Sequence, residues 1–310
     1  MRAIVINDFG ATPAVTDLPQ PKPEAGEVLV RVRASSLNGF DAATAAGMLE
    51  GMMEHRFPVV LGKDFAGTVE AVGDQVTSFA AGDQVFGVVM KPFLGDGGLG
   101  EYVTVSEAYG LAHIPADLSH ADAGALGLAA TAALNAVDAA APAEGQTLLV
   151  GGASGGVGAY AVQLAAARGA RVIATAKPGA EAALVQQLGA AHVVDYTGDL
   201  AGQVRAIAPA GVHAALHLAG DGAQLADLLA PGGRLASTLG FGPEALSRAD
   251  ATAISVMANP DRSTLERLAA DAAAGRLRIP VTRTYPLDDV PRALADFGAG
   301  AVGKFAVTVA

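Results

Sequence analysis

The sequence of 310 residues contains no cysteine. Disulfide bonds are therefore excluded, and so is every metal site that depends on thiolate ligands. No apolar run approaches the ~18 residues that a membrane-spanning helix requires. The first residues, MRAIVIND, show no signal-peptide pattern and read directly as a strand. From these absences we expect a cytoplasmic protein.

Charged residues are also scarce, at 16% of the chain, and the formal net charge is −11. This acidic balance argues against nucleic acid or an anionic membrane as the main partner. Hydrophobic residues make up 51% of the chain, which is enough to bury a large core. A chain of 310 residues has room for two domains, on a prior of roughly 150 residues each.

The most informative stretch runs from Gln146 to Lys177 and reads as strand, glycine-rich turn, helix and strand. The apolar run Thr147 to Val150 is typical of a buried parallel strand, and Gly169 is placed to end the helix. The turn follows G-x-x-G-x-x-G rather than the strict G-x-G-x-x-G. Its position between a strand and a helix favours a dinucleotide site over an ordinary tight turn.

Such a turn lets a pyrophosphate approach the free N–H groups at the start of a helix. A Cβ at Gly155 would obstruct that approach, and a Cβ at Gly158 would hold the helix off the strand. We therefore predict that six residues of the turn contact the cofactor: Gly152, Ser154, Gly155, Gly156, Val157 and Gly158.

The end of the second predicted strand bears on which dinucleotide binds. NAD sites usually have Asp or Glu there, about 20 residues past the glycines, but this chain reads Thr175-Ala176-Lys177. No carboxylate at that place repels a 2′-phosphate, and Lys177 offers a positive charge. The alternative is that Lys177 is an ordinary surface lysine. We predict NADPH as the cofactor.

Three segments differ in pattern. Residues 1–120 read as short β-branched strands separated by Pro and Gly turns, as a compact barrel requires. Residues 121–257 alternate helix and strand, which indicates an α/β fold with a doubly wound parallel sheet. Residues 258–310 are too few for a domain and are expected to complete the first one.

Several strings occur in one order along the chain: Gly62 to Gly67 (GKDFAG), Gly82 to Gly87 (GDQVFG), Gln187 to Tyr196 (QLGAAHVVDY), Pro231 to Arg234 (PGGR) and Gly303 to Phe305 (GKF). Together with the glycine turn, they resemble the medium-chain dehydrogenase/reductase superfamily, in its zinc-free quinone oxidoreductase (zeta-crystallin-like) type. The resemblance covers essentially the whole chain. It implies a GroES-like β-barrel catalytic domain, a Rossmann NADP-binding domain and a homodimer.

The resemblance also bears on zinc. Zinc-dependent members bind the catalytic metal with Cys, with His followed by Glu, and with a second Cys. Here the first place is Asn38 and the His-Glu pair reads Lys63-Asp64. His213 and His217 would stand about 13 Å apart on a strand, too far to share a metal. We therefore predict no metal. Without one, hydride transfer to a quinone or an activated C=C makes fewer demands on the protein than the oxidation of an alcohol.

The resemblance implies roles for four catalytic residues. Similar enzymes have an Asn facing the nicotinamide at the place of Asn38, where its amide would orient substrate, although Asn38 could also cap the helix after it. Asp41 is expected to support loop geometry, and Lys63 is either a donor in the substrate cleft or a surface charge. Thr131 matches a family threonine near the substrate. Ala43 replaces a Tyr found in many quinone reductases, which leaves the physiological acceptor open.

The remaining predicted cofactor contacts lie elsewhere. Lys177 and Tyr196 match family positions that contact the 2′-phosphate, and Lys304 and Phe305 match a terminal strand that closes over the cofactor. The others lie at or just after predicted Rossmann strands, whose carboxyl ends face the ligand: Thr175, Leu218, Ala219, Leu239, Gly240 and Phe241.

The sequence therefore predicts an NADPH-dependent oxidoreductase that transfers hydride to a small-molecule quinone or α,β-unsaturated carbonyl, with the proton from solvent or a hydroxyl. Two alternatives stay open. One is a stand-alone enoyl or enone reductase of a biosynthetic pathway, and the other is a protein that binds NADPH without turnover.

Overall fold

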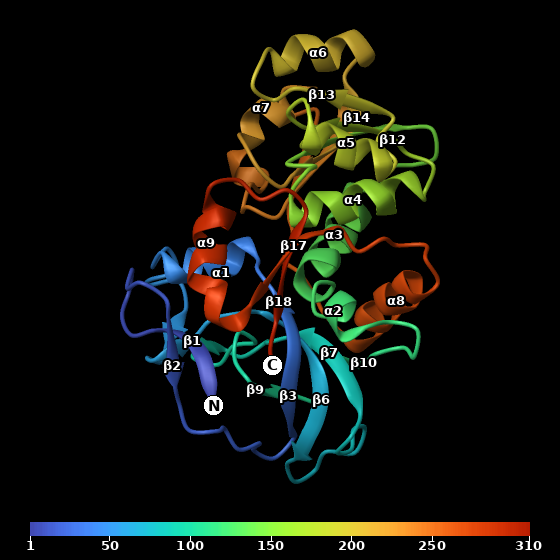
Figure 1. Cartoon of the computed structure of the whole chain (residues 1–310). Coiled ribbons are helices and arrows are strands. Elements are labelled where there is room, and N and C mark those ends of the chain that lie inside the picture. Colours follow the sequence, from blue (N-terminus) through green and yellow to red (C-terminus); the bar gives the residue numbers. More distant parts are fainter. The chain divides into compact units, whose positions relative to one another are not determined.

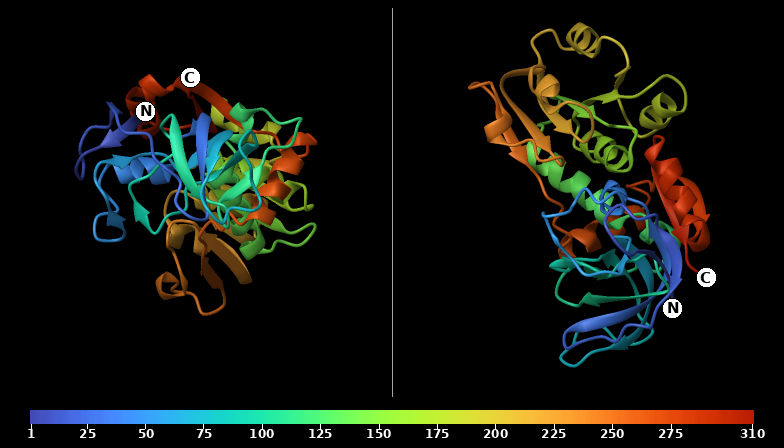
Figure 2. Two further views of the ribbon diagram at one scale, coloured as in Figure 1. Left: turned by 90° about the horizontal axis from the view of Figure 1, so that it is seen from below. Right: turned by 90° about the vertical axis from the view of Figure 1, so that its left-hand side faces the viewer.

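The computed structural model describes all residues from Met1 to Ala310 (Figure 1). The chain divides into two compact units. The split unit comprises Met1–Leu128 and Pro260–Ala310, and the continuous unit comprises Ala129–Asn259. The first boundary lies inside helix α3 (Gly127–Ala140). Both chain termini belong to the split unit (Figure 2).

The continuous unit contains a six-stranded parallel sheet in the order β13-β12-β11-β14-β15-β16. Its strands are β11 (Thr147–Gly151), β12 (Arg171–Thr175), β13 (His192–Val194), β14 (Val212–His217), β15 (Leu229–Ser237) and β16 (Thr252–Ser255). The connecting helices are α4 (Gly156–Ala166), α5 (Ala180–Gln187), α6 (Leu200–Ile207) and α7 (Gly222–Ala226), with the short η1 (Pro243–Ala245) before β16. The strand order reverses at β11, as in a doubly wound Rossmann sheet, so the predicted fold class is confirmed.

The central strand β11 shows why this sheet forms. Every residue of β11 is buried, and Leu148, Leu149 and Val150 are fully inaccessible to solvent. Helices cover both faces of a parallel sheet, so its central strands read as continuous apolar runs. The glycine turn joins β11 to α4. Gly169 lies in the connection from α4 to β12 and has φ +78°, a value that favours glycine.

The split unit is mostly antiparallel β-structure. Its strands are β1 (Arg2–Ile6), β2 (Ala14–Asp17), β3 (Glu27–Ser36), β4 (Glu54–His55), β5 (Val59–Val60), β6 (Asp64–Val72), β7 (Gln84–Val88), β8 (Phe93–Leu94), β9 (Tyr102–Ser106), β10 (Leu111–His113), β17 (Val281–Pro286) and β18 (Lys304–Thr308). The largest sheet runs β10-β7-β6-β3-β18-β17, and β9 also pairs with β3. Strand β18 pairs antiparallel with β3, so the end of the chain adds a strand to the sheet that its beginning forms.

Five helical segments belong wholly to the split unit: α1 (Gly39–Ala45), α2 (His120–Ala123), α8 (Arg262–Ala273), η2 (Leu287–Asp289) and α9 (Val290–Gly298). None of the helices in the protein has both the length and the apolar character needed to cross a membrane. Strand β3 alternates Val30 and Val32 inward with Arg31 and Arg33 outward, the period of two expected for a half-buried strand.

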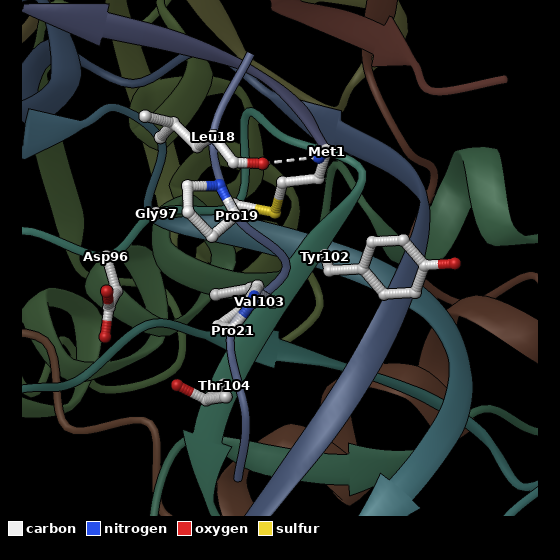
Figure 3. Close-up of a pocket in the computed structure, with 9 residues that line it drawn as sticks. All are labelled: Met1, Leu18, Pro19, Pro21, Asp96, Gly97, Tyr102, Val103 and Thr104. Carbon is white, nitrogen blue, oxygen red and sulfur yellow. Dashed lines mark hydrogen bonds between the residues drawn. The ribbon is translucent and has the colours of Figure 1, made fainter.

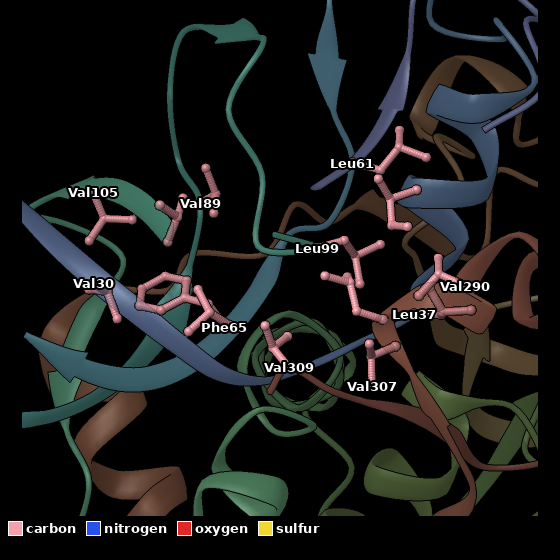
Figure 4. Packing of buried hydrophobic residues seen from close by; sticks show 14 of the residues in the cluster. Val30, Leu37, Leu61, Phe65, Val89, Leu99, Val105, Val290, Val307 and Val309 are labelled. Atoms are coloured by element: carbon pink, nitrogen blue, oxygen red, sulfur yellow. The ribbon is translucent and has the colours of Figure 1, made fainter. Parts of the chain in front are cut away.

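Most inward side chains of the split unit belong to one large hydrophobic core (Figure 4). Val30, Phe65 and Leu99 come from the N-terminal strands and their connections, whereas Val290 and Val307 come from the C-terminal segment. All five are buried. The two distant parts of the chain therefore share one core.

Candidate functional site

The glycine turn between β11 and α4 is closely packed at two of the three glycines of its G-x-x-G-x-x-G motif. A Cβ on Gly158 would lie 2.1 Å from the Gly152 carbonyl oxygen, and a Cβ on Gly152 would lie 2.8 Å from the Cβ of Ala219. A Cβ on Gly155 would meet only the Gly152 carbonyl oxygen, at 3.5 Å. Protein atoms thus exclude side chains at 152 and 158, whereas the space at 155 is open. An anion at the start of α4 needs that open space.

Thr175 at the end of β12 supports this turn from below. Its hydroxyl accepts a hydrogen bond from Gly152 N at 2.9 Å and donates one to Val150 O at 3.2 Å. The side chain is buried. Thr175 was predicted to contact the cofactor, and in the structure its side chain stabilises the conformation of the glycine turn.

A polar cluster lies beside the turn at the end of β12, and we call it the ribose corner: Ser154, Lys177, Glu181 and Tyr196. The Glu181 carboxylate accepts from Ser154 Oγ at 2.9 Å, Lys177 N at 3.1 Å and Tyr196 Oη at 3.3 Å. The Lys177 ammonium lies 5.4 Å from the centroid of the Tyr196 ring. Interaction with the Tyr196 hydroxyl raises the pKa of Lys177, so the side chain is a cation at neutral pH.

Three of the four residues of the ribose corner were predicted from the sequence, and Glu181 was not. The prediction looked for an acidic residue only at the end of β12. Glu181 lies in the first turn of α5, four residues after Lys177, and helix α5 turns it back toward the strand end. An acidic residue in the first turn of the helix that follows β12 was the available signal.

The loops that follow β14 and β15 are fixed by a histidine–serine pair that the sequence analysis missed. His217 Nδ1 lies 3.0 Å from Ser237 Oγ, and His217 Nε2 lies 3.1 Å from Gly220 O. A carbonyl oxygen can only accept, so Nε2 has the proton and Nδ1 accepts from the Ser237 hydroxyl. Both side chains are buried.

The Ser237 hydroxyl also positions the predicted residues after β15. It accepts from Leu239 N at 3.0 Å and from Phe241 N at 3.2 Å, while Gly240 between them has φ +80°. The Leu239 side chain is 57% exposed. After β14, Leu218 N donates to Gly151 O at 3.1 Å, which attaches that loop to the glycine turn.

In the split unit, Asp64 is the centre of a buried charge cluster that includes Asn38 and Lys304. Asp64 Oδ2 accepts from Asn38 Nδ2 at 2.9 Å, from Lys304 Nζ at 3.3 Å and from the Ser36 hydroxyl. Asp64 Oδ1 accepts from Leu128 N at 2.7 Å. Asp64 is 0% exposed and Lys304 is 1% exposed. Both oxygens of the Asp64 carboxylate therefore have donors, and an opposite charge lies next to it, as a buried carboxylate requires.

Lys304 also donates to Asn38 Oδ1 at 2.8 Å and to Leu37 O at 3.1 Å. An ammonium group has three N–H donors and no acceptor, so all three donors of Lys304 have partners within the split unit. The same contact fixes the Asn38 amide, because its oxygen must face the ammonium. One N–H of Asn38 bonds Asp64 and the second is left over.

Phe305, the other predicted residue of this strand, is 2% exposed. Its ring lies 5.7 Å from that of Tyr285 and 5.8 Å from that of Phe297. The structure therefore places the Lys304 and Phe305 side chains in internal contacts of the split unit. Their contact with a cofactor stays a prediction.

Asp41 and Lys63 lie beside the charge cluster. Asp41 Oδ2 accepts from Asn38 N at 2.9 Å, across the first turn of α1. Burial first, and the nearby Asp64 carboxylate second, raise the pKa of Asp41 to about 7. Lys63 Nζ donates to Val89 O at 2.8 Å, and burial lowers its pKa against an opposing effect of Asp41. Lys63 is 8% exposed, so it is not a solvated surface charge.

Two cavities open in the split unit. Asp41 and Lys63 line one of about 10 Å³, which has room for about one water. The other has a volume of about 170 Å³, and Met1, Pro19 and Tyr102 are among the residues that line it (Figure 3). None of the predicted site residues lines this second cavity. Thr131 in α3 lines neither; it is 0% exposed, and its hydroxyl has no hydrogen-bond partner in the structure.

Comparisons with known proteins agree with this architecture. A family model described as the alcohol dehydrogenase GroES-like domain matches residues 24–116, and one described as zinc-binding dehydrogenase matches residues 188–307. The quinone oxidoreductase of Coxiella burnetii has a similar structure, with a TM-score of 0.91 and 28% identity over 100% of this chain and 99% of that chain. This chain belongs to the medium-chain dehydrogenase/reductase superfamily, quinone oxidoreductase type.

Two further members of the superfamily are similar. Chloroplastic quinone-oxidoreductase QR1 of Triphysaria versicolor is 37% identical over 207 residues, which is 63% of this chain and 61% of that protein. The matches to the first curated relatives thus span about three-fifths of their length. A mycobacterial protein complexed with NADPH is 27% identical over 99% of this chain and 100% of that chain, with a TM-score of 0.85.

Zinc is the metal that the second family model names, and the residues here do not fit it. No group of three or more His, Cys, Asp or Glu side chains in the structure could hold a metal ion. The oxygens of Asn38 and Asp64, which stand at places where the resemblance puts zinc ligands, already bind the Lys304 ammonium. A metal cation at those oxygens would be repelled by a buried ammonium about 3 Å away.

The residues of the continuous unit do fit a dinucleotide. The space at Gly155 would admit a pyrophosphate beside the first N–H groups of α4. The ribose corner contains a hydroxyl, a backbone N–H and a phenol, all three bonded to the Glu181 carboxylate, together with a lysine cation. Binding of NAD(P)H is typical of the superfamily.

Proposed function

We propose that the protein is an NADPH-dependent oxidoreductase that transfers hydride to a quinone or an α,β-unsaturated carbonyl compound without zinc. The observation that carries the proposal is the arrangement around Asn38. A protein cation, Lys304, occupies the oxygens of Asn38 and Asp64, and one amide N–H of Asn38 is left over. That arrangement can donate a hydrogen bond to an oxygen on a substrate, but it cannot coordinate a metal.

The ribose corner supports NADPH as the form of the cofactor. Lys177 is exposed and is not in an ion pair, so its charge is available to a 2′-phosphate. Ser154 and Tyr196 supply hydroxyl donors next to it. The mycobacterial relative with NADPH bound is consistent with this choice. The bound cofactor would supply the hydride.

The chain's own contribution is orientation and hydrogen bonding. The Asn38 amide is held from two sides by Lys304 and Asp64, so its remaining N–H has a fixed direction. A fixed donor stabilises the negative charge that develops on an enolate or hydroquinone oxygen better than water does. The proton that follows the hydride would come from solvent or from a hydroxyl.

The test is NADPH oxidation, followed at 340 nm, against one panel of quinones and one of enones of matched size. We expect turnover on at least one panel, unchanged after dialysis against a zinc chelator. Asn38→Ala should lower kcat by about 10²-fold, the usual effect of removing one such donor. Asn135→Ala is the control, because Asn135 is an asparagine on α3 that bonds only the Asn259 backbone among the contacts described. Tight NADPH binding without turnover on either panel would contradict the proposal and support a non-catalytic NADPH-binding protein.

The panels also separate the two kinds of acceptor. Turnover confined to enones would make the protein an enoyl or enone reductase, and turnover of quinones would support the quinone reductase assignment. A homodimer and a cytoplasmic location stay predictions. Light scattering on the purified protein tests the first.

A further inference from the structure

The Glu181 carboxylate accepts all three hydrogen bonds that the ribose corner directs at an anion. Its three hydrogen bonds come from Ser154 Oγ, Lys177 N and Tyr196 Oη, at 2.9, 3.1 and 3.3 Å. These donors are neutral. Two of them bond Oε2 and the third bonds Oε1 of the same carboxylate, beside the glycine turn. Donors arranged in this way bind carboxylate and phosphate oxygens alike.

The cation of the corner is not used to hold this carboxylate. The Lys177 ammonium lies over the Tyr196 ring, 5.4 Å from its centroid, and only its backbone N–H bonds Glu181. Glu181 itself is half-buried. The corner therefore holds an internal anion next to a cation that is in no ion pair, and an incoming phosphate would have to displace that anion.

We propose that Glu181 is the residue that sets the choice between the phosphorylated and the unphosphorylated cofactor, by competing with the 2′-phosphate for Ser154, Tyr196 and the Lys177 N–H. This inference rests on the proposed function for the location of the adenosine ribose. A 2′-phosphate gains the attraction of Lys177 and loses by the repulsion of Glu181, which must leave its three donors. An unphosphorylated ribose meets neither effect, and its hydroxyls can donate to the carboxylate.

The competition predicts a weak preference in the native protein and a strong one once the charge is removed. Glu181→Gln keeps the shape of the side chain and removes its charge. We expect the variant to bind adenosine 2′,5′-bisphosphate at least about tenfold more tightly than the native protein does, which corresponds to about 1.4 kcal/mol. Binding of 5′-AMP, which lacks the 2′-phosphate, should change by less than about threefold.

Isothermal titration calorimetry with these two nucleotides tests the proposal on the full chain without any acceptor substrate. Glu266→Gln is the matched control, because it removes the same charge from an exposed position on α8 in the split unit. Glu181→Ala replaces the glutamine variant if that variant does not fold. A crystal of the NADPH complex should show the Glu181 carboxylate away from Ser154.

The outcomes separate this inference from the proposed function. If Glu181→Gln widens the preference for the bisphosphate and the native protein already prefers it, both proposals are supported. If the native protein prefers 5′-AMP and the variant reverses that preference, Glu181 sets the choice and NADPH as the native cofactor is wrong. If the ratio of the two affinities is the same in both proteins, or if both affinities fall together, the inference about Glu181 is overturned whichever nucleotide the native protein prefers.

Discussion

Two groups of similar chemistry occur in the two units of this chain. In the split unit, Lys304 and Asp64 are buried and bonded to each other, with Asn38 completing the cluster. In the continuous unit, Lys177 and Glu181 are within reach of solvent, and their charges are not paired directly. Each group contains a lysine, a carboxylate and neutral donors, so the difference between them is burial.

Burial decides what such a group can do. A buried ammonium and a buried carboxylate must stay together, because neither can be left alone without a penalty of several kcal/mol. The Lys304 cluster is therefore part of the fold and presents at most one spare donor. In the ribose corner Lys177 and Tyr196 are exposed and Glu181 is half-buried, so these three residues can exchange partners at small cost, as a ligand-binding group must.

Lys304→Met should give the largest loss. The Asp64 carboxylate, which is 0% exposed, would lose its cation. Breaking a buried pair in this way costs about 3–5 kcal/mol. Urea unfolding, followed by circular dichroism, measures the change. Lys304→Arg is a second variant that keeps the charge, and it should recover part of the loss. A change below about 1 kcal/mol for Lys304→Met would show that water reaches Asp64 and that the cluster is not structural.

Asp41 makes the stability of the split unit depend on pH. Its pKa is raised to about 7 in the folded chain, against about 3.9 when unfolded, so the folded chain binds the extra proton between these values. Stability from this group is therefore present below about pH 4 and falls as pH rises to about 7. Asp41→Asn removes this dependence, and should exceed the native protein by about 2–4 kcal/mol at pH 8 and by little at pH 4.

Unfolding curves at pH 4, 6 and 8 check the Asp41 prediction. Asp250→Asn is the informative control, because the Arg248 guanidinium lowers the pKa of Asp250 and the sign is therefore reversed. That exposed pair should produce only a small effect. A native protein and an Asp41→Asn variant with parallel pH profiles would mean that Asp41 ionises in the fold at its ordinary pKa.

The glycine turn allows the same contrast between packing and ligand binding. Gly158→Ala places a Cβ 2.1 Å from a backbone oxygen and should cost about 1–3 kcal/mol in unfolding free energy. Gly155→Ala finds open space and should leave stability within about 0.5 kcal/mol. Its effect should instead be a tenfold or larger loss of NADPH affinity, measured by calorimetry. Equal NADPH affinities for Gly155→Ala and the native protein would place the pyrophosphate elsewhere.

The elements of the Rossmann sheet were largely predictable because local signals and tertiary packing agree there. The apolar run of β11 and the glycine turn follow from periodicity and turn residues. Strands β16 and β17 have no comparable signal in the sequence. β16 follows a loop and has only one buried residue, and β17 has three exposed residues in a row, so neither shows a strand pattern. Their pairing with β15 and β18 is what makes them strands.

Three residues of the ribose corner were predictable because each follows a strand of the parallel sheet. Ser154, Lys177 and Tyr196 follow consecutive strands, and the general geometry of parallel sheets brings such ends together. Lys304 and Asp64 are separated by 240 residues and meet because β18 pairs with β3. No local pattern in the sequence predicts that contact. Glu181 was missed for a different reason. It lies only four residues after Lys177, but its orientation depends on how α5 turns back from β12.

Lys177→Met tests the solvated member of the comparison and should have the smallest effect on stability. The ammonium is exposed and its main contact is the face of the Tyr196 ring, so unfolding free energy should change by less than about 0.5 kcal/mol. The Kd for adenosine 2′,5′-bisphosphate should nevertheless rise about tenfold, because the variant loses the only cation of the ribose corner, while the Kd for 5′-AMP stays within about twofold. Calorimetry and urea unfolding on the same preparation give both numbers. A loss of stability as large as that of Lys304→Met would mean that burial does not distinguish the two lysines, and equal losses for the two nucleotides would remove Lys177 from the phosphate site.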